Sequence, residues 1–171
     1  MCSSVSAAAV AADTLAADVA FFSIGTNDLV QYTLAVDRGN ANLASRFTPL
    51  HPAVLRLIAM TIDAGHDAGL DVSVCGEMAS HPLAAFVLVG LGLRQLSVSP
   101  RLVPAVKQLV RTVTAREAAA AAAAAVSLPT AAAVEEELRA RLTAACAAAG
   151  IAPGGLIALE SERIILSSDE P

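Results

Sequence analysis

Short apolar runs alternate with longer amphipathic stretches along the first two thirds of the chain. The runs Phe21–Gly25, Leu70–Val74 and Leu96–Ser99 are bounded by Gly, Pro or polar residues, which is typical of short buried strands. Apolar side chains recur at helical spacing between Pro52 and Gly69, and a further helix is expected from Pro82 to Val89. Strands that alternate with helices predict an α/β fold with a parallel sheet, which could be open or closed.

Polar side chains follow two of these strands directly. Thr26-Asn27-Asp28 comes after the first strand, and Cys75-Gly76-Glu77 comes after the second. Ligands in α/β folds bind at the carboxyl ends of the strands. Two more helices are expected at the margins of this pattern, from Ala7 to Val19 and from Pro104 to Val113.

The composition changes at Ala115. An unbroken alanine run from Ala118 to Ala125 predicts a helix, because alanine is the best helix former. Thr130 can cap a second helix that ends at Gly150, with glutamates early and arginines late. We therefore divide the chain into residues 1–114, an Ala-rich helical pair at 115–150 belonging to the same domain, and a tail at 151–171 that could form a hairpin or remain loose.

Composition excludes several classes of protein. The chain has 171 residues, of which 56% are hydrophobic, and a formal net charge of −5, which argues against nucleic-acid binding. Its apolar stretches are too short to span a membrane. Cys2, Cys75 and Cys146 are odd in number and widely spaced, which does not suggest disulfides or a zinc site and favours a reducing, cytoplasmic location.

Two blocks of sequence carry a resemblance to a known family. The stretch Phe21–Asn40 resembles the signature of the phosphoenolpyruvate–protein phosphotransferases, which are enzyme I of the bacterial sugar phosphotransferase system. Val74–Ala79 is similar to their catalytic cysteine motif, at the expected distance. The resemblance covers about Ala7 to Gly150. Pyruvate phosphate dikinase shares the Thr-Asn-Asp and Cys-Gly-Glu elements, but Tyr32–Arg38 favours the protein phosphotransferases.

The resemblance implies a (β/α)8 TIM barrel that binds phosphoenolpyruvate and Mg²⁺, with the three strands here matching strands six to eight. Asn27 would contact the substrate phosphate, Asp28 would hold Mg²⁺, Arg38 would clamp the substrate, and Cys75 would protonate the enolate to give pyruvate. These roles suit the side chains. A carboxylate is a hard ligand for Mg²⁺, Arg offers a planar fork of donors, and a thiol has a reference pKa of about 8.5.

The resemblance also places important parts outside these residues. The phospho-accepting histidine lies on an N-terminal domain that passes the phosphoryl group to the phosphocarrier protein HPr, and the family's C-terminal domain forms its dimer. The family's metal-binding Glu and a following Pro are replaced by Ser4 and Ser6. We therefore expect a truncated gene, a frameshift or a broken assembly near Ala7. We also expect a partial barrel that is inactive alone and poorly folded or aggregation-prone without a partner.

Each candidate residue also has a plainer interpretation. Asn27 and Asp28 could form a turn after a strand, and a lone cysteine such as Cys75 is usually a small buried side chain. Cys146 is expected to be packing, and His51, His66 and His81 are not expected to carry phosphate. Three functions remain open at this stage: the phosphotransferase or a dikinase-like relative, an interaction fragment that pairs with a full-length homologue, and a relic without function.

Overall fold

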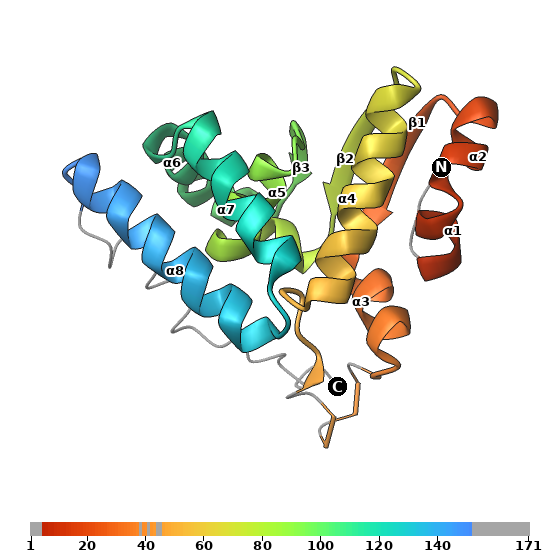
Figure 1. The fold of residues 1–171 in the computed structure, drawn as a ribbon, viewed down its shortest axis with the longest axis horizontal. Coiled ribbons are helices and arrows are strands. Elements are labelled where there is room, and N and C mark those ends of the chain that lie inside the picture. Colours follow the sequence, from red (N-terminus) through yellow and green to blue (C-terminus); the bar gives the residue numbers. More distant parts are fainter. Residues whose placement is uncertain (1–4, 38, 41, 44–45, 152–171) are drawn as a thin grey trace.

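A computed structural model describes residues 5–37, 39–40, 42–43 and 46–151. Its centre is a three-stranded parallel sheet in the order β1-β2-β3 (Figure 1). The strands are β1 (Phe21–Gly25), β2 (Asp71–Cys75) and β3 (Gln95–Ser97). The α/β class with a parallel sheet is therefore confirmed, whereas closure into a barrel stays a prediction.

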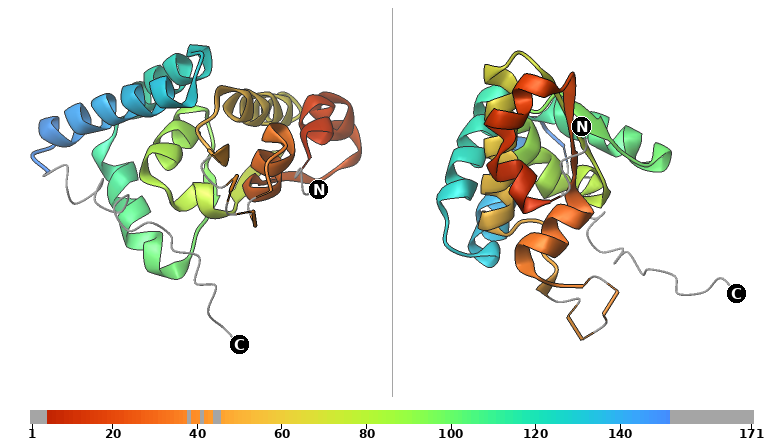
Figure 2. Two further views of the ribbon diagram at one scale, coloured as in Figure 1. Left: turned by 90° about the horizontal axis from the view of Figure 1, so that it is seen from below. Right: turned by 90° about the vertical axis from the view of Figure 1, so that its right-hand side faces the viewer.

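The helices of the described residues lie mainly to one side of this sheet and around its ends (Figures 1 and 2). The longer helices are α3 (Thr26–Leu34), α4 (Pro52–Asp67), α5 (Pro82–Gly90), α6 (Val103–Thr112), α7 (Ala115–Ser127) and α8 (Ala131–Ala148). The short ones are α1 (Ser6–Val10), α2 (Ala12–Leu15), and the 3-10 turns η1 (Ala16–Asp18), η3 (Glu77–Ser80) and η4 (Pro100–Leu102). Figure 2 shows that α2, α4, α7 and α8 form a row along one side of the sheet.

The two faces of the sheet differ in chemistry. Phe22 and Ile24 of β1 and Val72 and Val74 of β2 are buried, and they share the face on which α4 packs. Because side chains alternate along a strand, the intervening residues point to the opposite face. These intervening residues are exposed or half-buried, and most are small and polar: Phe21, Ser23, Asp71, Ser73 and Cys75. The core thus lies between the sheet and one layer of helices.

The alanine run allows two helices to approach closely. Ala118, Ala121, Ala122 and Ala125 are buried along the face of α7 that meets α5 and the rest of the core. A Cβ atom added to Gly90, at the end of α5, would lie only 2.0 Å from the Ala118 carbonyl oxygen. Small side chains on both helices are therefore required by the distance between them.

Both alanine-rich helices have side-chain caps at their N-termini, of which the sequence predicted only Thr130. Thr114 and Glu117 form a capping box at the start of α7, in which the Glu117 amide donates to Thr114 Oγ1 at 3.2 Å. The Ala133 amide donates to Thr130 Oγ1 at the start of α8, also at 3.2 Å. At the other end of α7, Arg56 of α4 donates from Nε to the Val126 carbonyl at 2.8 Å, which ties α7 to α4.

Apart from shifts of one or two residues in element bounds, the structure departs from the sequence-based expectations in two places. The helix expected from Ala7 to Val19 is broken at Ala11 into α1 and α2 and ends in the turn η1. The Thr26-Asn27-Asp28 cluster is not a turn alone, because it forms the first turn of α3, which sequence analysis missed. Cys2 and the tail at 152–171 lie outside the described residues. The division into 1–114, 115–150 and 151–171 and the aggregation of the isolated chain remain predictions.

One expectation about membranes can be checked. In the part of the chain that the structure describes, no helix combines the length and the apolar character needed to cross a bilayer.

We predict that Gly90→Ala destabilises the chain, although Ala is normally favoured over Gly inside a helix by about 1 kcal/mol. The added methyl group would meet the Ala118 carbonyl, a backbone atom that cannot rotate away. We expect a net loss of about 2 kcal/mol, which is within the range for overpacked cores. Urea denaturation followed by circular dichroism measures this change. An unchanged or raised midpoint would contradict the close packing of α5 on α7.

Candidate functional site

The candidate site is built where β1 and β2 end side by side. Gly25 is the last residue of β1, and its register partner on β2 is Cys75. Thr26, Asn27 and Asp28 follow immediately as the first turn of α3. The parallel pairing therefore brings Asn27 and Asp28 to the same edge of the sheet as Cys75, although they are separated along the sequence. Arg38, the fourth residue predicted from the sequence, lies outside the described residues.

The two strand ends are joined by a buried hydrogen bond. The Thr26 hydroxyl is fully buried and donates to the Cys75 carbonyl at 3.0 Å. Gly76 follows with φ 115° and ψ 178°, a conformation that is essentially restricted to glycine. A Cβ atom at Gly76 would lie 2.4 Å from Thr26 Oγ1. Sequence analysis did not single out either residue, although a Gly directly after a strand was a signal for close approach.

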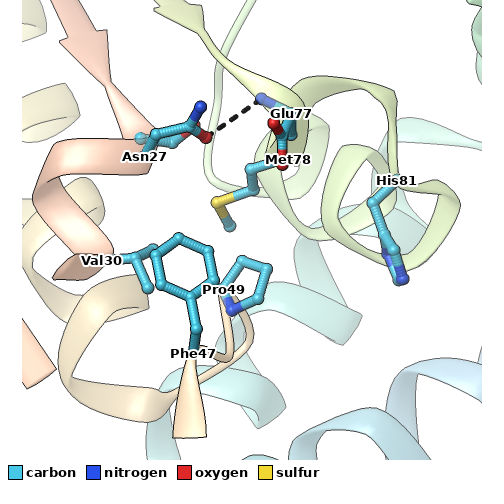
Figure 3. A pocket seen from close by; sticks show the side chains of 8 residues that line it. Asn27, Val30, Phe47, Pro49, Glu77, Met78 and His81 are labelled. Carbon is cyan, nitrogen blue, oxygen red and sulfur yellow. Dashed lines mark hydrogen bonds between the residues drawn. The ribbon is translucent and has the colours of Figure 1, made fainter. Parts of the chain in front are cut away.

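The Asn27 side chain is oriented by the loop after β2. Its Oδ1 accepts a hydrogen bond from the Glu77 amide at 3.3 Å (Figure 3). Because the oxygen of the amide is engaged in this way, its NH2 group points away from Glu77 and offers two donors. Asp28 is exposed one residue further along, in the first turn of α3, where a negative charge is favoured by the helix dipole.

The Cys75 thiol lies on the polar face of the sheet. It is half-buried, donates to the Ile24 carbonyl at 3.6 Å, and accepts from Ser23 Oγ at 3.8 Å. Cys146 differs in every respect, because it is fully buried on α8 and burial raises the pKa of its thiol. The expectation that Cys146 contributes only packing agrees with this position.

An apolar hollow of about 170 Å³ adjoins the site (Figure 3). Val30, Phe47, Pro49 and Met78 provide most of its wall. A wall of this kind does not suit a highly charged ligand, since charged groups are costly to bury without partners. The rest of the lining comes from Thr26, Asn27, Glu77 and His81, so the hollow is apolar on one side and meets the polar strand ends on the other.

Asp28 is the carboxylate to which the family resemblance gives a role in holding Mg²⁺. Within the described ranges, no group of three or more His, Cys, Asp or Glu side chains lies together as a ready cation site. Mg²⁺ typically uses only one or two protein carboxylates and takes its remaining ligands from water and substrate phosphate. The exposed carboxylate of Asp28 fits that pattern as a single ligand.

Two of the histidines have structural partners. His51 Nδ1 accepts from the Ala53 amide at 3.2 Å, and His81 Nδ1 accepts from the Ala84 amide at 3.4 Å. Each histidine therefore caps the helix that begins with the following proline. His66 lies exposed on α4. These positions explain the His-Pro pairs as helix starts.

A parallel α/β sheet with amide, carboxylate and thiol groups at the carboxyl ends of its strands defines the class of the protein as an α/β domain with polar groups where ligands of such folds commonly bind. Residues 1–115 match the family model of PEP-utilising enzymes, PEP-binding domain. Because this match spans more than half of the chain, the chain belongs to that family.

Individual relatives are named more specifically. The chain is 48% identical over 129 residues to the phosphoenolpyruvate-protein phosphotransferase of Haemophilus influenzae, covering 75% of this chain and 22% of that protein. It is 54% identical over 88 residues to the protein of the same name from Cupriavidus necator, covering 52% and 15%. It is also 52% identical over 107 residues to a multiphosphoryl transfer protein of Xanthomonas campestris pv. campestris, covering 63% and 13%. The chain thus spans about a fifth of the length of the first of these relatives.

We predict that Gly76→Ala destabilises the chain by roughly 3 kcal/mol, because it combines a disfavoured backbone conformation with a clash against Thr26. Gly69→Ala is the matched control. Gly69 also has positive φ, at 69°, but a Cβ there meets nothing within 4 Å, so only about 1 kcal/mol should be lost. Chemical denaturation measures the free energy of unfolding of each variant relative to the wild type. Equal losses would show that the Thr26–Gly76 contact contributes nothing.

Proposed function

We propose that this chain contributes part of the phosphoenolpyruvate site of a phosphoenolpyruvate-dependent phosphoryl transfer to a protein histidine, the first step of the bacterial sugar phosphotransferase system. The observation that carries the proposal is the joining of Asn27, Asp28 and Cys75 at one edge of the sheet, inside the region that matches the family. The names of the similar relatives support the same reaction.

The roles proposed for the residues follow their chemistry. The free NH2 group of Asn27 donates to a phosphate oxygen of the substrate, and Asp28 holds the Mg²⁺ that offsets phosphate charge. Arg38, which lies outside the described residues, clamps the substrate through its planar donors. Asn27 needs no rearrangement for this task, because the Glu77 amide already fixes its orientation.

Cys75 is assigned to the proton transfer that completes the reaction. Transfer of the phosphoryl group to a histidine breaks the P–O bond of phosphoenolpyruvate and forms a P–N bond, which leaves an enolate. The Cys75 S–H bond then breaks, and its proton forms a C–H bond at the methylene carbon of the enolate. The electron pair of the S–H bond stays on sulfur, which becomes a thiolate, and pyruvate leaves. Cys75 is half-buried on the polar face of the sheet, where a substrate at the strand ends can reach it.

The fold that accompanies this reaction is proposed to be the last part of a (β/α)8 TIM barrel, with β1, β2 and β3 as strands six to eight. The small, polar side chains on the face away from α4 would then point into the barrel. The histidine, transfer to HPr, homodimer formation and a cytoplasmic location belong to the same proposal. We expect this chain alone to show no turnover, since losing part of a phosphate clamp costs orders of magnitude in rate.

A second candidate function is binding to another protein chain, and the position of β1 as an edge strand favours it. In the sheet formed by the described residues β1 stands at one edge, next to β2. Edge strands are the places where a sheet can be extended by a strand of another chain. The chain could therefore pair with a full-length homologue. A pulldown with that homologue, compared with a Phe21→Lys variant, would show whether this edge is used. The dikinase-like alternative is less favoured, because the similar relatives named above are protein phosphotransferases or a multiphosphoryl transfer protein.

We predict that the chain binds phosphoenolpyruvate only when Mg²⁺ is present and that Asp28→Ala weakens this binding at least about tenfold, equal to roughly 1.4 kcal/mol. The reason is the loss of the carboxylate assigned to the metal. Isothermal titration calorimetry with and without Mg²⁺ measures the effect.

Asp71→Ala is the matched control for that experiment. It removes the same charge from an exposed residue at the opposite end of the sheet, where β2 begins. Binding should survive in this variant. Equal binding by the wild type and Asp28→Ala, or no binding by the wild type in the presence of Mg²⁺, would contradict the assignment of a phosphoenolpyruvate site to these residues.

A further inference from the structure

Two serines lie near the thiol on the polar face of the sheet, and their hydroxyl groups have different hydrogen-bond acceptors. Ser23 of β1 and Ser73 of β2 are register partners, and both lie on the same face as Cys75. Ser23 Oγ donates to Cys75 Sγ at 3.8 Å, whereas Ser73 Oγ donates to the Phe22 carbonyl at 3.3 Å. The two neighbouring hydroxyl groups therefore donate to different acceptors.

The two hydrogen bonds of the thiol favour different protonation states. The bond from Cys75 Sγ to the Ile24 carbonyl exists only while sulfur carries its proton. The bond from Ser23 can persist after the proton has left, and a hydrogen bond to a charged acceptor is stronger than one to a neutral acceptor. Once Cys75 has given up its proton, the Ser23 hydroxyl can therefore still donate a hydrogen bond to the sulfur.

We propose that Ser23 is a positioning residue that orients the Cys75 thiol and donates a hydrogen bond to the thiolate formed in the proton transfer. This inference rests on the proposed function of Cys75. The proton moves from sulfur to the methylene carbon of the enolate, the electron pair stays on sulfur, and the Ser23 hydroxyl keeps its own proton throughout. Ser23 contacts the sulfur and is not assigned any contact with the substrate.

The charged groups near β2 do not provide the hydrogen bond to the Cys75 sulfur. Asp71 lies on β2 itself but at its opposite end, and α4 packs on the other face of the sheet. Glu77 on η3 and Asp28 on α3 are both exposed to solvent. The charged or titratable groups that α4 carries are Arg56, Asp63, His66 and Asp67. All of these groups remain the same in the variants compared below.

The test is the pH profile of alkylation of Cys75 by iodoacetamide, followed by peptide mass spectrometry so that each cysteine is read separately. The alkylation rate reports the fraction of thiolate. Ser23→Ala removes the donor to the sulfur, so we expect the alkylation rate of Cys75 at neutral pH to fall several-fold and its profile over pH to differ from that of the wild type. Cys146 serves as an internal reference because it is fully buried.

Two further variants separate positioning from general loosening of the sheet. Ser73→Ala removes a neighbouring hydroxyl that donates to the Phe22 carbonyl, and its profile should match the wild type. Ser23→Thr retains a hydroxyl and should restore most of the rate. An unchanged profile in Ser23→Ala, or equal shifts in Ser23→Ala and Ser73→Ala, would overturn the inference. No phosphoenolpyruvate is present, so this result is independent of the calorimetric test of the proposed function.

Discussion

The parallel pairing of β1 with β2 is the constraint on which the candidate site depends. It places Gly25 beside Cys75. Thr26 and Gly76, which follow these two residues, are therefore within reach of each other. The Thr26 hydroxyl closes the contact by donating to the Cys75 carbonyl, and Gly76 leaves room for it. Asn27 is then oriented by the Glu77 amide. A slip of one residue in this register would turn every side chain of a strand to the other face and separate these groups.

In the layer of helices, the packing depends on the close approach of small residues. A run of alanines gives little apolar area per residue, so it contributes to a core mainly by allowing backbones to come near one another. Gly90 against Ala118 is the clearest case. Larger side chains such as Phe22, Phe86 and Leu138 then fill the remaining space in the same hydrophobic cluster. The alanine-rich composition is therefore a packing solution as well as a reflection of helix propensity.

Local patterns predicted the strands and most helices because each of these elements has its own signal. Phe21–Gly25 agrees with β1, and Pro52 begins α4 as expected. The break at Ala11 and the helix from Thr26 to Leu34 were missed, because alanine does not signal an interruption and Thr26-Asn27-Asp28 also reads as a turn. The motif singled out Asn27, Asp28 and Cys75, which the strand register brings to one end of the sheet. The contacts of Thr26, Gly76 and Ser23 depend on strand pairing, which the pattern of a single strand does not encode.

The polar face of the sheet has a consequence for what can lie against it. Ser23, Ser73 and Cys75 present hydroxyl and thiol groups rather than a continuous hydrocarbon surface. Water can solvate such a face at little cost, whereas an oily layer placed on it would strip hydration from groups that need hydrogen-bond partners. A well-matched neighbour for this side of the sheet would bring its own donors and acceptors, and the boundary between them would be wet.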